Sequence, residues 1–211
     1  HPGYTVISYV NTTAAVKAVT DVVVTSTNAR QIVESFPEDE KIIFGPDRNL
    51  GNYINSVTGR NMLLWDGACH VHEQFSVEKI VELKQQHPGA VVLAHPECKN
   101  TVLKLADVVG STAALLKYAV AHPEKKYIVA TESGILHEMQ KKCPQTKFIP
   151  APPNDSTCAC NECNFMRLNT LEKLYNCLKD ESPEIKVDAE IAEKAVKPIK
   201  RMLEISAKLG L

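Results

Sequence analysis

Cysteines follow two apolar runs of this 211-residue chain, at places where they could hold a metal. Cys69 comes soon after the run at 62–65, and Cys158, Cys160 and Cys163 fall within six residues after the run at 147–151. Thiolates are ligands for zinc and for iron–sulfur clusters, and both kinds of centre need several of them. Thiolates that come from equivalent places in two parts of the chain therefore predict a shared metal site.

Other interpretations of these thiols stay open. Cys69 by itself could be a buried, inert thiol, because unpaired cysteines often behave as small apolar residues. The group at 158–163 could hold zinc, although a structural zinc site needs four ligands and no second cysteine pair lies nearby. Two of its three thiols could instead form a redox dithiol.

An imidazole and a carboxylate stand together in His95-Pro96-Glu97, at the end of another apolar run. Proline disfavours helical backbone at the residue before it, which keeps both side chains at the end of the run. A histidine and a glutamate placed in this way suit proton transfer. The plainer alternative is a capping Glu97 beside a hydrogen-bonded His95. Tyr9 and Asn11 occupy the matching places 86 residues earlier, which favours a shared site.

The chain repeats itself once at this spacing of 86 residues. His1-Pro2-Gly3 returns as His87-Pro88-Gly89. The alignment has no gap, so Lys41-Ile42-Ile43-Phe44 lies opposite Tyr127-Ile128-Val129-Ala130. Internal repetition sets the architecture of a chain, and here it predicts two copies of one fold. We expect each copy to bring different polar groups to a common site.

Each copy shows strands alternating with helices, which indicates a parallel sheet with right-handed crossovers. The strands are apolar throughout, as expected when helices cover both faces of a sheet. We therefore predict an α/β fold of two homologous three-layer αβα domains, at 1–86 and 87–180, each with about four strands, and a helical extension at 181–211. Pro198 should kink or break the last helix, at 189–209. Strands are expected at 5–10, 21–25, 42–45, 62–65, 91–95, 107–109, 127–131 and 147–151.

Polar side chains concentrate at the carboxyl ends of these strands, where ligands bind in open parallel sheets. Ser26 and Thr112 lie at the starts of predicted helices there. They could be plain N-caps. Helix N-termini that face a crevice also present backbone N–H groups and the positive end of the helix dipole. A ligand with phosphate or carboxylate groups would suit this edge.

The composition excludes several classes of function. A formal net charge of −1 gives no basic field to attract nucleic acid or an anionic membrane. No apolar run approaches the roughly 18 residues of a membrane span, and no signal peptide is visible. Seven cysteines is an odd count, which argues against a disulfide framework and fits a reducing compartment. We expect a cytoplasmic protein that binds neither nucleic acid nor a membrane.

Taken together, these residues resemble the quinolinate synthase family, the iron–sulfur enzymes of de novo NAD synthesis. The resemblance runs in order along nearly the whole chain. It rests on Tyr9-Val10-Asn11-Thr12, Thr25-Ser26-Thr27-Asn28-Ala29, Pro46-Asp47-Arg48-Asn49-Leu50-Gly51, Trp65-Asp66-Gly67-Ala68-Cys69-His70-Val71-His72-Glu73, His95-Pro96-Glu97-Cys98, Gly110-Ser111-Thr112, Ala130-Thr131-Glu132-Ser133-Gly134-Ile135 and Cys163-Asn164-Phe165-Met166.

The resemblance implies an enzyme that condenses iminosuccinate (iminoaspartate) with dihydroxyacetone phosphate to give quinolinate, phosphate and water. A 4Fe-4S cluster, held by one cysteine from each of three homologous domains, would act as a Lewis acid. Cys69 matches the ligand from the second domain, and Cys163 matches the ligand from the third. Cys158 and Cys160 match variable positions that could be redox-active.

The resemblance also implies the roles of the polar residues at the strand ends. Glu97 would be the general base, with Tyr9 and His95 assisting it. The positions that match substrate-binding residues of the family are Tyr9, Asn11, Ser26, His95, Glu97 and Thr112.

This chain resembles the second and third domains of the family. We therefore expect a first domain, with the third cysteine ligand, to be missing before His1, and the chain to be inactive alone. L-aspartate oxidase or aspartate dehydrogenase would supply the iminosuccinate. The alternative is a non-catalytic metal- or redox-binding α/β module that uses Cys158, Cys160 and Cys163.

Overall fold

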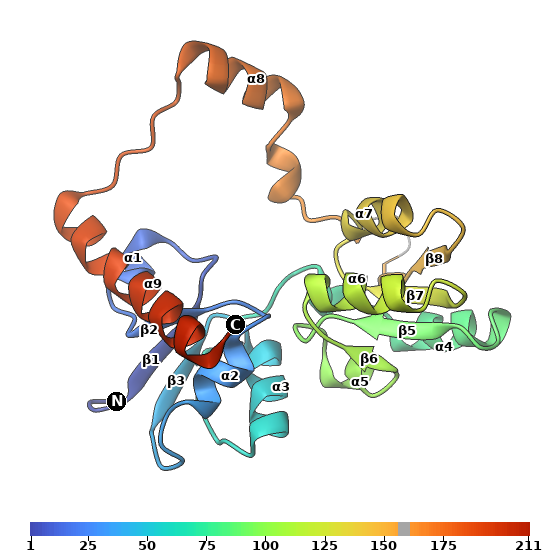
Figure 1. Cartoon of the computed structure of the whole chain (residues 1–211), viewed down its shortest axis with the longest axis horizontal. Helices are drawn as coiled ribbons and strands as arrows, with labels where there is room; N and C mark the ends of the chain where they lie inside the picture. The colour runs from blue at the N-terminus through green and yellow to red at the C-terminus, as the bar shows by residue number, and fades with distance from the viewer. Residues whose placement is uncertain (156–160) are drawn as a thin grey trace.

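The computed structural model describes residues 1–155 and 161–211, and its fold is α/β, as predicted. The first repeat contains a four-stranded parallel sheet with the strand order β2-β1-β3-β4 (Figure 1). Its elements are β1 (Thr5–Tyr9), α1 (Ala14–Lys17), β2 (Val22–Val24), α2 (Ala29–Glu34), β3 (Ile42–Gly45), α3 (Arg48–Thr58) and β4 (Leu63–Leu64).

The second repeat contains a second four-stranded parallel sheet, with the equivalent order β6-β5-β7-β8. A short 3-10 helix, η1 (His72–Gln74), and helix α4 (Val77–Gln86) connect the two sheets. The elements of the second repeat are β5 (Val91–Ala94), α5 (Asn100–Leu103), β6 (Val108–Val109), α6 (Thr112–Ala121), β7 (Lys126–Ala130), α7 (Ile135–Lys142) and β8 (Lys147–Pro150).

Strand pairing confirms the internal repeat but corrects its register at one strand. Ile7 pairs with Val22 and Leu93 with Val108, which keeps the spacing of 86 residues in the first two strands. In the third strand, however, Thr5 pairs with Ile42 while Val91 pairs with Tyr127. The spacing there is 127 − 42 = 85, so the gapless alignment is wrong at β3 and β7.

The one-residue shift is undone before the fourth strand. Phe44 pairs with Leu64 and Val129 with Pro150, so the fourth strands are again 150 − 64 = 86 residues apart. The connections before and after the third strand therefore differ by one residue each, in opposite senses. One consequence is that Asp47, two residues after β3, is equivalent to Glu132, two residues after β7.

Apolar strands form the centre of each repeat, with helices on both faces of each sheet. Ile7, Val22, Phe44 and Leu50 belong to the fully buried core of the first repeat. Side chains just before the helices cap them: Asp47 Oδ1 accepts the Leu50 N–H at 2.7 Å, and Ser111 Oγ accepts the Ala114 N–H at 3.3 Å. Such caps satisfy backbone donors that the first helical turn leaves unpaired. They start these helices at the carboxyl ends of the strands.

The helix before the second repeat packs against the second sheet. Ile80 of α4 shares a buried cluster with Val92 and Ile128. The η1 segment belongs to the same cluster through Val71 and Phe75. The connection after the first sheet is therefore part of the second core, and it carries His72 toward β7.

The C-terminal segment returns to the first repeat (Figure 1). After η2 (Met166–Leu168), helix α8 (Leu171–Asp180) has no buried residue. Helix α9 (Ala189–Leu209) packs against α1, β2 and α2, and Met202 and Ile205 contact the first core. The helix continues through Pro198, so of the predicted kink or break the break does not occur. Among the residues that the structure describes, none of the helices has both the length and the apolar character needed to cross a membrane.

Candidate active site at the carboxyl ends of the strands

A cavity of about 670 Å³ lies at the carboxyl ends of strands from both repeats. The first repeat contributes Tyr9 at the end of β1, Asn11 after β1 and Cys69 after β4. The second repeat contributes Glu97 after β5, and Cys163 lies beyond β8. The structure thus brings five of the predicted site residues, from distant parts of the sequence, to one place.

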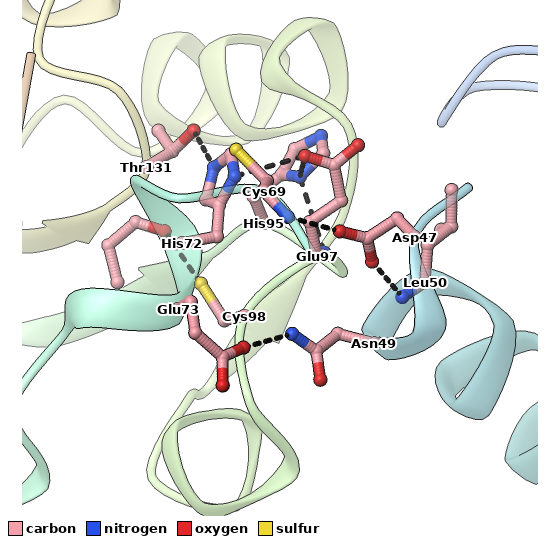
Figure 2. Close-up of polar contacts among 11 residues, drawn as sticks. Asp47, Asn49, Leu50, Cys69, His72, Glu73, His95, Glu97, Cys98 and Thr131 are labelled. Atoms are coloured by element: carbon pink, nitrogen blue, oxygen red, sulfur yellow. Dashed lines mark hydrogen bonds and ion pairs between the residues drawn. The ribbon is translucent and has the colours of Figure 1, made fainter. Parts of the chain in front are cut away.

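Cys69 is held from its backbone by a carboxylate of its own repeat (Figure 2). Its N–H donates to Asp47 Oδ2 at 2.7 Å, while the other oxygen of Asp47 caps α3 at Leu50. The Cys69 thiol is free and partly exposed to the cavity. Asp47 itself is only 5% exposed.

Cys163 is held in the corresponding way. Its N–H donates to Glu132 Oε1 at 3.4 Å, and Glu132 Oε2 accepts the Gly134 N–H at 2.7 Å. Two residues earlier, the Asn161 side-chain amide donates to the carbonyl of Ala151, just after β8. The Cys163 thiol is also free and partly exposed. Cys158 and Cys160 lie outside the described residues.

His72 lines the cavity and contacts residues of both repeats (Figure 2). Its Nδ1 lies 3.0 Å from Glu97 Oε2, and its Nε2 lies 3.1 Å from the hydroxyl oxygen of Thr131, just after β7. One ligand atom from each of Cys69, His72 and Glu97 lies within 4.8 Å of the other two, so these three residues could hold a metal ion. His72 therefore contacts both a candidate metal ligand and the candidate base.

His95 is packed against His72 and Glu97. The two imidazole rings stack with centroids 4.7 Å apart and an interplanar angle of 23°. The Glu97 N–H donates to His95 Nδ1 at 3.3 Å, so this nitrogen acts as an acceptor and the ring proton resides on Nε2 in the neutral form. His95 is buried and does not itself line the cavity.

The environment separates the ionisation of the three central groups. Burial favours neutral His72, but hydrogen bonds to Cys69 and Glu97 outweigh burial and raise the pKa of His72 to about 9. Burial lowers the pKa of His95 to about 4, and the charge on His72 adds to this effect. Burial alone would raise the pKa of Glu97, but His72 and His95 bring it below its ordinary value. At neutral pH the site thus contains a charged His72, a neutral His95 and an ionised Glu97.

The remaining predicted substrate residues are spread over different surroundings. Burial raises the pKa of Tyr9, against an opposing hydrogen bond from Ser26, so the phenol keeps its proton at neutral pH. Asn11 is exposed at the cavity. Ser26 is partly buried beside Tyr9 but is not among the cavity-lining residues. Thr112 begins α6, is exposed and does not line this cavity.

Sequence reasoning missed Thr131 and the carboxylate contacts of the two cysteines. Thr131 is a plain strand-end residue, and nothing in its sequence surroundings indicates a histidine partner 59 residues away. Asp47 and Glu132 had a visible signal, because each is an acidic residue two positions after a third strand. The gapless alignment concealed it by placing Asp47 opposite Ser133.

Two residues at this cavity are suitable ligands for an iron–sulfur cluster. Cys69 and Cys163 are free thiols on one cavity, and each side chain is partly exposed. Sulfur donors select zinc, copper or iron–sulfur centres over hard cations. The thiols of Cys98 and Cys143 are buried in cores and line no part of this cavity.

The fold and the site define an α/β protein with two homologous sheets, whose shared cavity combines thiols with an acid–base group. The family model described as "Quinolinate synthetase A protein" matches residues 1–204, so the chain belongs to this family of enzymes. It is 55% identical to the quinolinate synthase of Chloroherpeton thalassium over 206 residues, 98% of this chain and 64% of that protein. It is also 55% identical to the quinolinate synthase of Synechococcus sp. over 207 residues, 98% of this chain and 65% of that protein. The chain thus spans slightly less than two thirds of the length of these relatives.

Proposed function

We propose that this chain contributes two of the domains of a quinolinate synthase site, which condenses iminosuccinate with dihydroxyacetone phosphate to give quinolinate, phosphate and water. The observation that carries the proposal is the shared cavity. It joins Cys69 and Cys163 to Glu97, Tyr9 and Asn11, although these residues come from two separate sheets. The family membership agrees with this assignment.

Cys69 and Cys163 would hold a 4Fe-4S cluster together with a further thiolate. When bound, a cluster with one iron free of protein ligands supplies a Lewis acid that can polarise a substrate oxygen. The chain's own contribution is to present both thiols at one cavity and to keep their backbones fixed through Asp47 and Glu132.

Glu97 is the general base in this proposal. Its lowered pKa leaves it ionised at neutral pH, so it can accept a proton from the condensing carbon skeleton. His72 and His95 flank its carboxylate and orient it toward the cavity. Because the pKa of His72 is about 9, its ring is positively charged at neutral pH. This charge stabilises the ionised carboxylate of Glu97, which still has an oxygen that can accept a proton.

The other substrate residues would bind rather than react. Protonated Tyr9 can donate a hydrogen bond to a substrate oxygen, and neutral His95 supports Glu97. Asn11 offers amide groups at the cavity. Ser26 and Thr112 keep their predicted role near helix N-termini, which suits the phosphate or carboxylates of the substrates. Iminosuccinate would come from an oxidase or dehydrogenase acting on L-aspartate, and we place the reaction in the cytoplasm.

A segment exchange tests the proposal. Residues 1–204 would replace the matching segment of the Chloroherpeton thalassium relative, and quinolinate formation would be measured anaerobically after iron and sulfide reconstitution. We expect product at a rate within about tenfold of the unaltered relative, and loss of iron in the Cys69→Ser and Cys163→Ser versions. A well-folded exchange protein that binds iron but makes no quinolinate would contradict the proposed function.

The second candidate, a metal or redox module built on Cys158, Cys160 and Cys163, predicts a different outcome. Iron or zinc binding should then survive Cys69→Ser and be lost when Cys158 or Cys160 is replaced. The shared cavity favours the first candidate, because Cys163 faces the same space as Cys69.

A further inference from the structure

The two cysteines of the cavity share one supporting feature that depends on the corrected register. Asp47 and Glu132 are equivalent residues, each two positions after the third strand of its repeat. Each uses one carboxylate oxygen to accept the N–H of the cysteine and the other to accept an N–H in the following turn. Figure 2 shows this arrangement for Asp47, between Cys69 and Leu50.

We propose that Asp47 and Glu132 are a matched pair of positioning residues, each of which fixes the metal-binding cysteine of its own repeat through the backbone. The inference rests on the proposed function for the identity of the metal, a 4Fe-4S cluster. It does not depend on that function for the contacts themselves, which are hydrogen bonds between residues of this chain.

The physical reason lies in what a carboxylate does to a backbone N–H. A hydrogen bond with an ionised acceptor is roughly twice as strong as a neutral one, so it restricts the residue that donates it. The bond also occupies the backbone N–H of the cysteine, which could otherwise donate a hydrogen bond to the cysteine sulfur. Hydrogen bonds to sulfur and the charge nearby are among the factors that set the potential of a cluster.

The two halves of the pair are not equally strong. The contact of Asp47 with the Cys69 N–H is 2.7 Å long, and Asp47 is 5% exposed. The contact of Glu132 with the Cys163 N–H is 3.4 Å long, and Arg167 lies 3.9 Å from the same Glu132 oxygen. Asp47 should therefore restrict its cysteine more strongly than Glu132 does.

The nearest comparison within the chain is a second matched pair. Asp21 and Asp107 accept the N–H groups of Val6 and Val92 at 2.7 and 2.8 Å. They have the same chemistry and the same repeat relationship, but they act on strand residues and line no part of the cavity. Asp107→Asn is thus a control for the loss of a carboxylate as such.

Hydrogen exchange at the cysteine amides of the metal-free 211-residue chain gives the first test. In Asp47→Ala, exchange at the Cys69 N–H should become about tenfold faster or more, because a charge-assisted bond is lost. Glu132→Ala should accelerate exchange at Cys163 by a smaller factor. Asp47→Asn has one acceptor oxygen where Asp47 uses two, so it should keep the helix cap at Leu50 and restore the protection at Cys69 only in part. Asp107→Asn should leave both cysteine amides unchanged.

The cluster potential in the reconstituted segment exchange gives the second test. Asp47→Asn and Glu132→Gln should each shift the midpoint to a more positive potential, because a negative charge near the cluster is removed. Their iron content should stay close to that of the unaltered exchange protein. Asp107→Asn should leave the potential unchanged.

The outcomes separate this inference from the proposed function. Unchanged exchange at Cys69 in a folded Asp47→Ala protein would overturn the positioning role, whatever the cluster does. An unchanged midpoint potential in both Asp47→Asn and Glu132→Gln would overturn the proposed effect of these carboxylates on the cluster. If the unaltered exchange protein assembles no cluster, the proposed function fails, while the amide exchange still decides the positioning role.

Discussion

Nε2 of His72 lies 3.1 Å from the hydroxyl oxygen of Thr131, and this contact links the segment after the first sheet to the residue that follows β7 in the second repeat. The other nitrogen of the same ring lies 3.0 Å from Glu97 Oε2. His72 is 6% exposed, so neither nitrogen can rely on bulk water. Thr131 thus fixes the ring that faces the candidate base.

Replacing this threonine should affect both stability and turnover. In Thr131→Val the shape is kept but the hydroxyl is lost, which leaves a buried imidazole nitrogen unpaired. The expected loss of unfolding free energy is about 1–3 kcal/mol. In the segment exchange protein, turnover should also fall, because Glu97 loses its oriented neighbour. Urea unfolding and a quinolinate assay measure the two effects.

Thr146→Val is the matched control for this change. Thr146 is also buried in the second repeat, and its hydroxyl donates to the Pro123 carbonyl at 2.7 Å, before the start of β8. It should lose stability to a similar degree and keep its turnover. Equal turnover in the two variants would show that Thr131 is only a structural residue.

Removing the carboxylate of Glu97 should stop proton transfer and leave the metal site in place. A carboxamide cannot accept the proton, so Glu97→Gln should lower turnover by about 10²–10⁴-fold in the segment exchange protein. The absorbance and iron content should not change, since the cysteines are untouched. Glu73→Gln is the control: Glu73 pairs with Arg48 and Asn49 and does not line the cavity. Near-normal turnover in Glu97→Gln would mean that Glu97 only positions the substrate.

The cysteines should differ in their reactivity as the cavity predicts. Cys69 and Cys163 are partly exposed, whereas Cys98 is fully buried and Cys143 is 5% exposed. Burial also raises the pKa of the Cys98 thiol, which disfavours its reactive thiolate. Alkylation of the native, metal-free chain should label Cys69 and Cys163 well before Cys98 and Cys143. Mass spectrometry of the peptides gives the order, and early labelling of Cys98 would contradict the packing described for it.

The sequence was sufficient for the strands and the repeat but not for every register. The strand expected at 5–10 is observed at Thr5–Tyr9. A strand that is buried on both faces is a continuous apolar run, so the ends of the run predict the ends of the strand. The shift at β3 and β7 could not be seen, since connecting loops differ in length without changing the strands. Pro198 does not break α9, because the helix buries Ala195 and Pro198 itself, and this packing outweighs the local preference of proline.

The candidate site was predictable where it depends on strand ends and not where it depends on packing between segments far apart in the sequence. Tyr9 ends a strand, Cys69 and Glu97 follow strands, and the carboxyl edge of a parallel sheet brings such residues together. The contact of His72 with Thr131 needs the segment after the first sheet to pack onto the second sheet, which no local pattern contains. The return of α9 to the first repeat is a long-range contact of the same kind.

The opposite pKa shifts of the two stacked histidines predict a stability maximum near neutral pH in the metal-free chain. His72 titrates near 6.5 when unfolded and near 9 when folded, so its contribution is complete below pH 6.5 and is lost as pH rises through 9. His95 titrates near 6.5 when unfolded and near 4 when folded, so its contribution is complete above pH 6.5 and is lost as pH falls through 4. At ~1.4 kcal/mol per pKa unit, each contribution is on the order of 3 kcal/mol.

Single-histidine variants separate the two limbs of this profile. The stability difference between the wild-type chain and His72→Asn should shrink as pH rises from 6.5 to 9.5. The difference for His95→Asn should shrink as pH falls from 6.5 to 4. In each case the stability difference should change by ~1.4 kcal/mol in total for each unit of pKa shift. The exposed His137 lies outside this stacked pair, so His137→Asn is the control for the loss of a histidine as such. His72→Asn should also weaken the acid limb, because the charge on His72 helps to keep the pKa of His95 low. Urea unfolding midpoints at each pH measure these differences, and parallel profiles for all three variants would refute the opposed ionisation of the stacked pair.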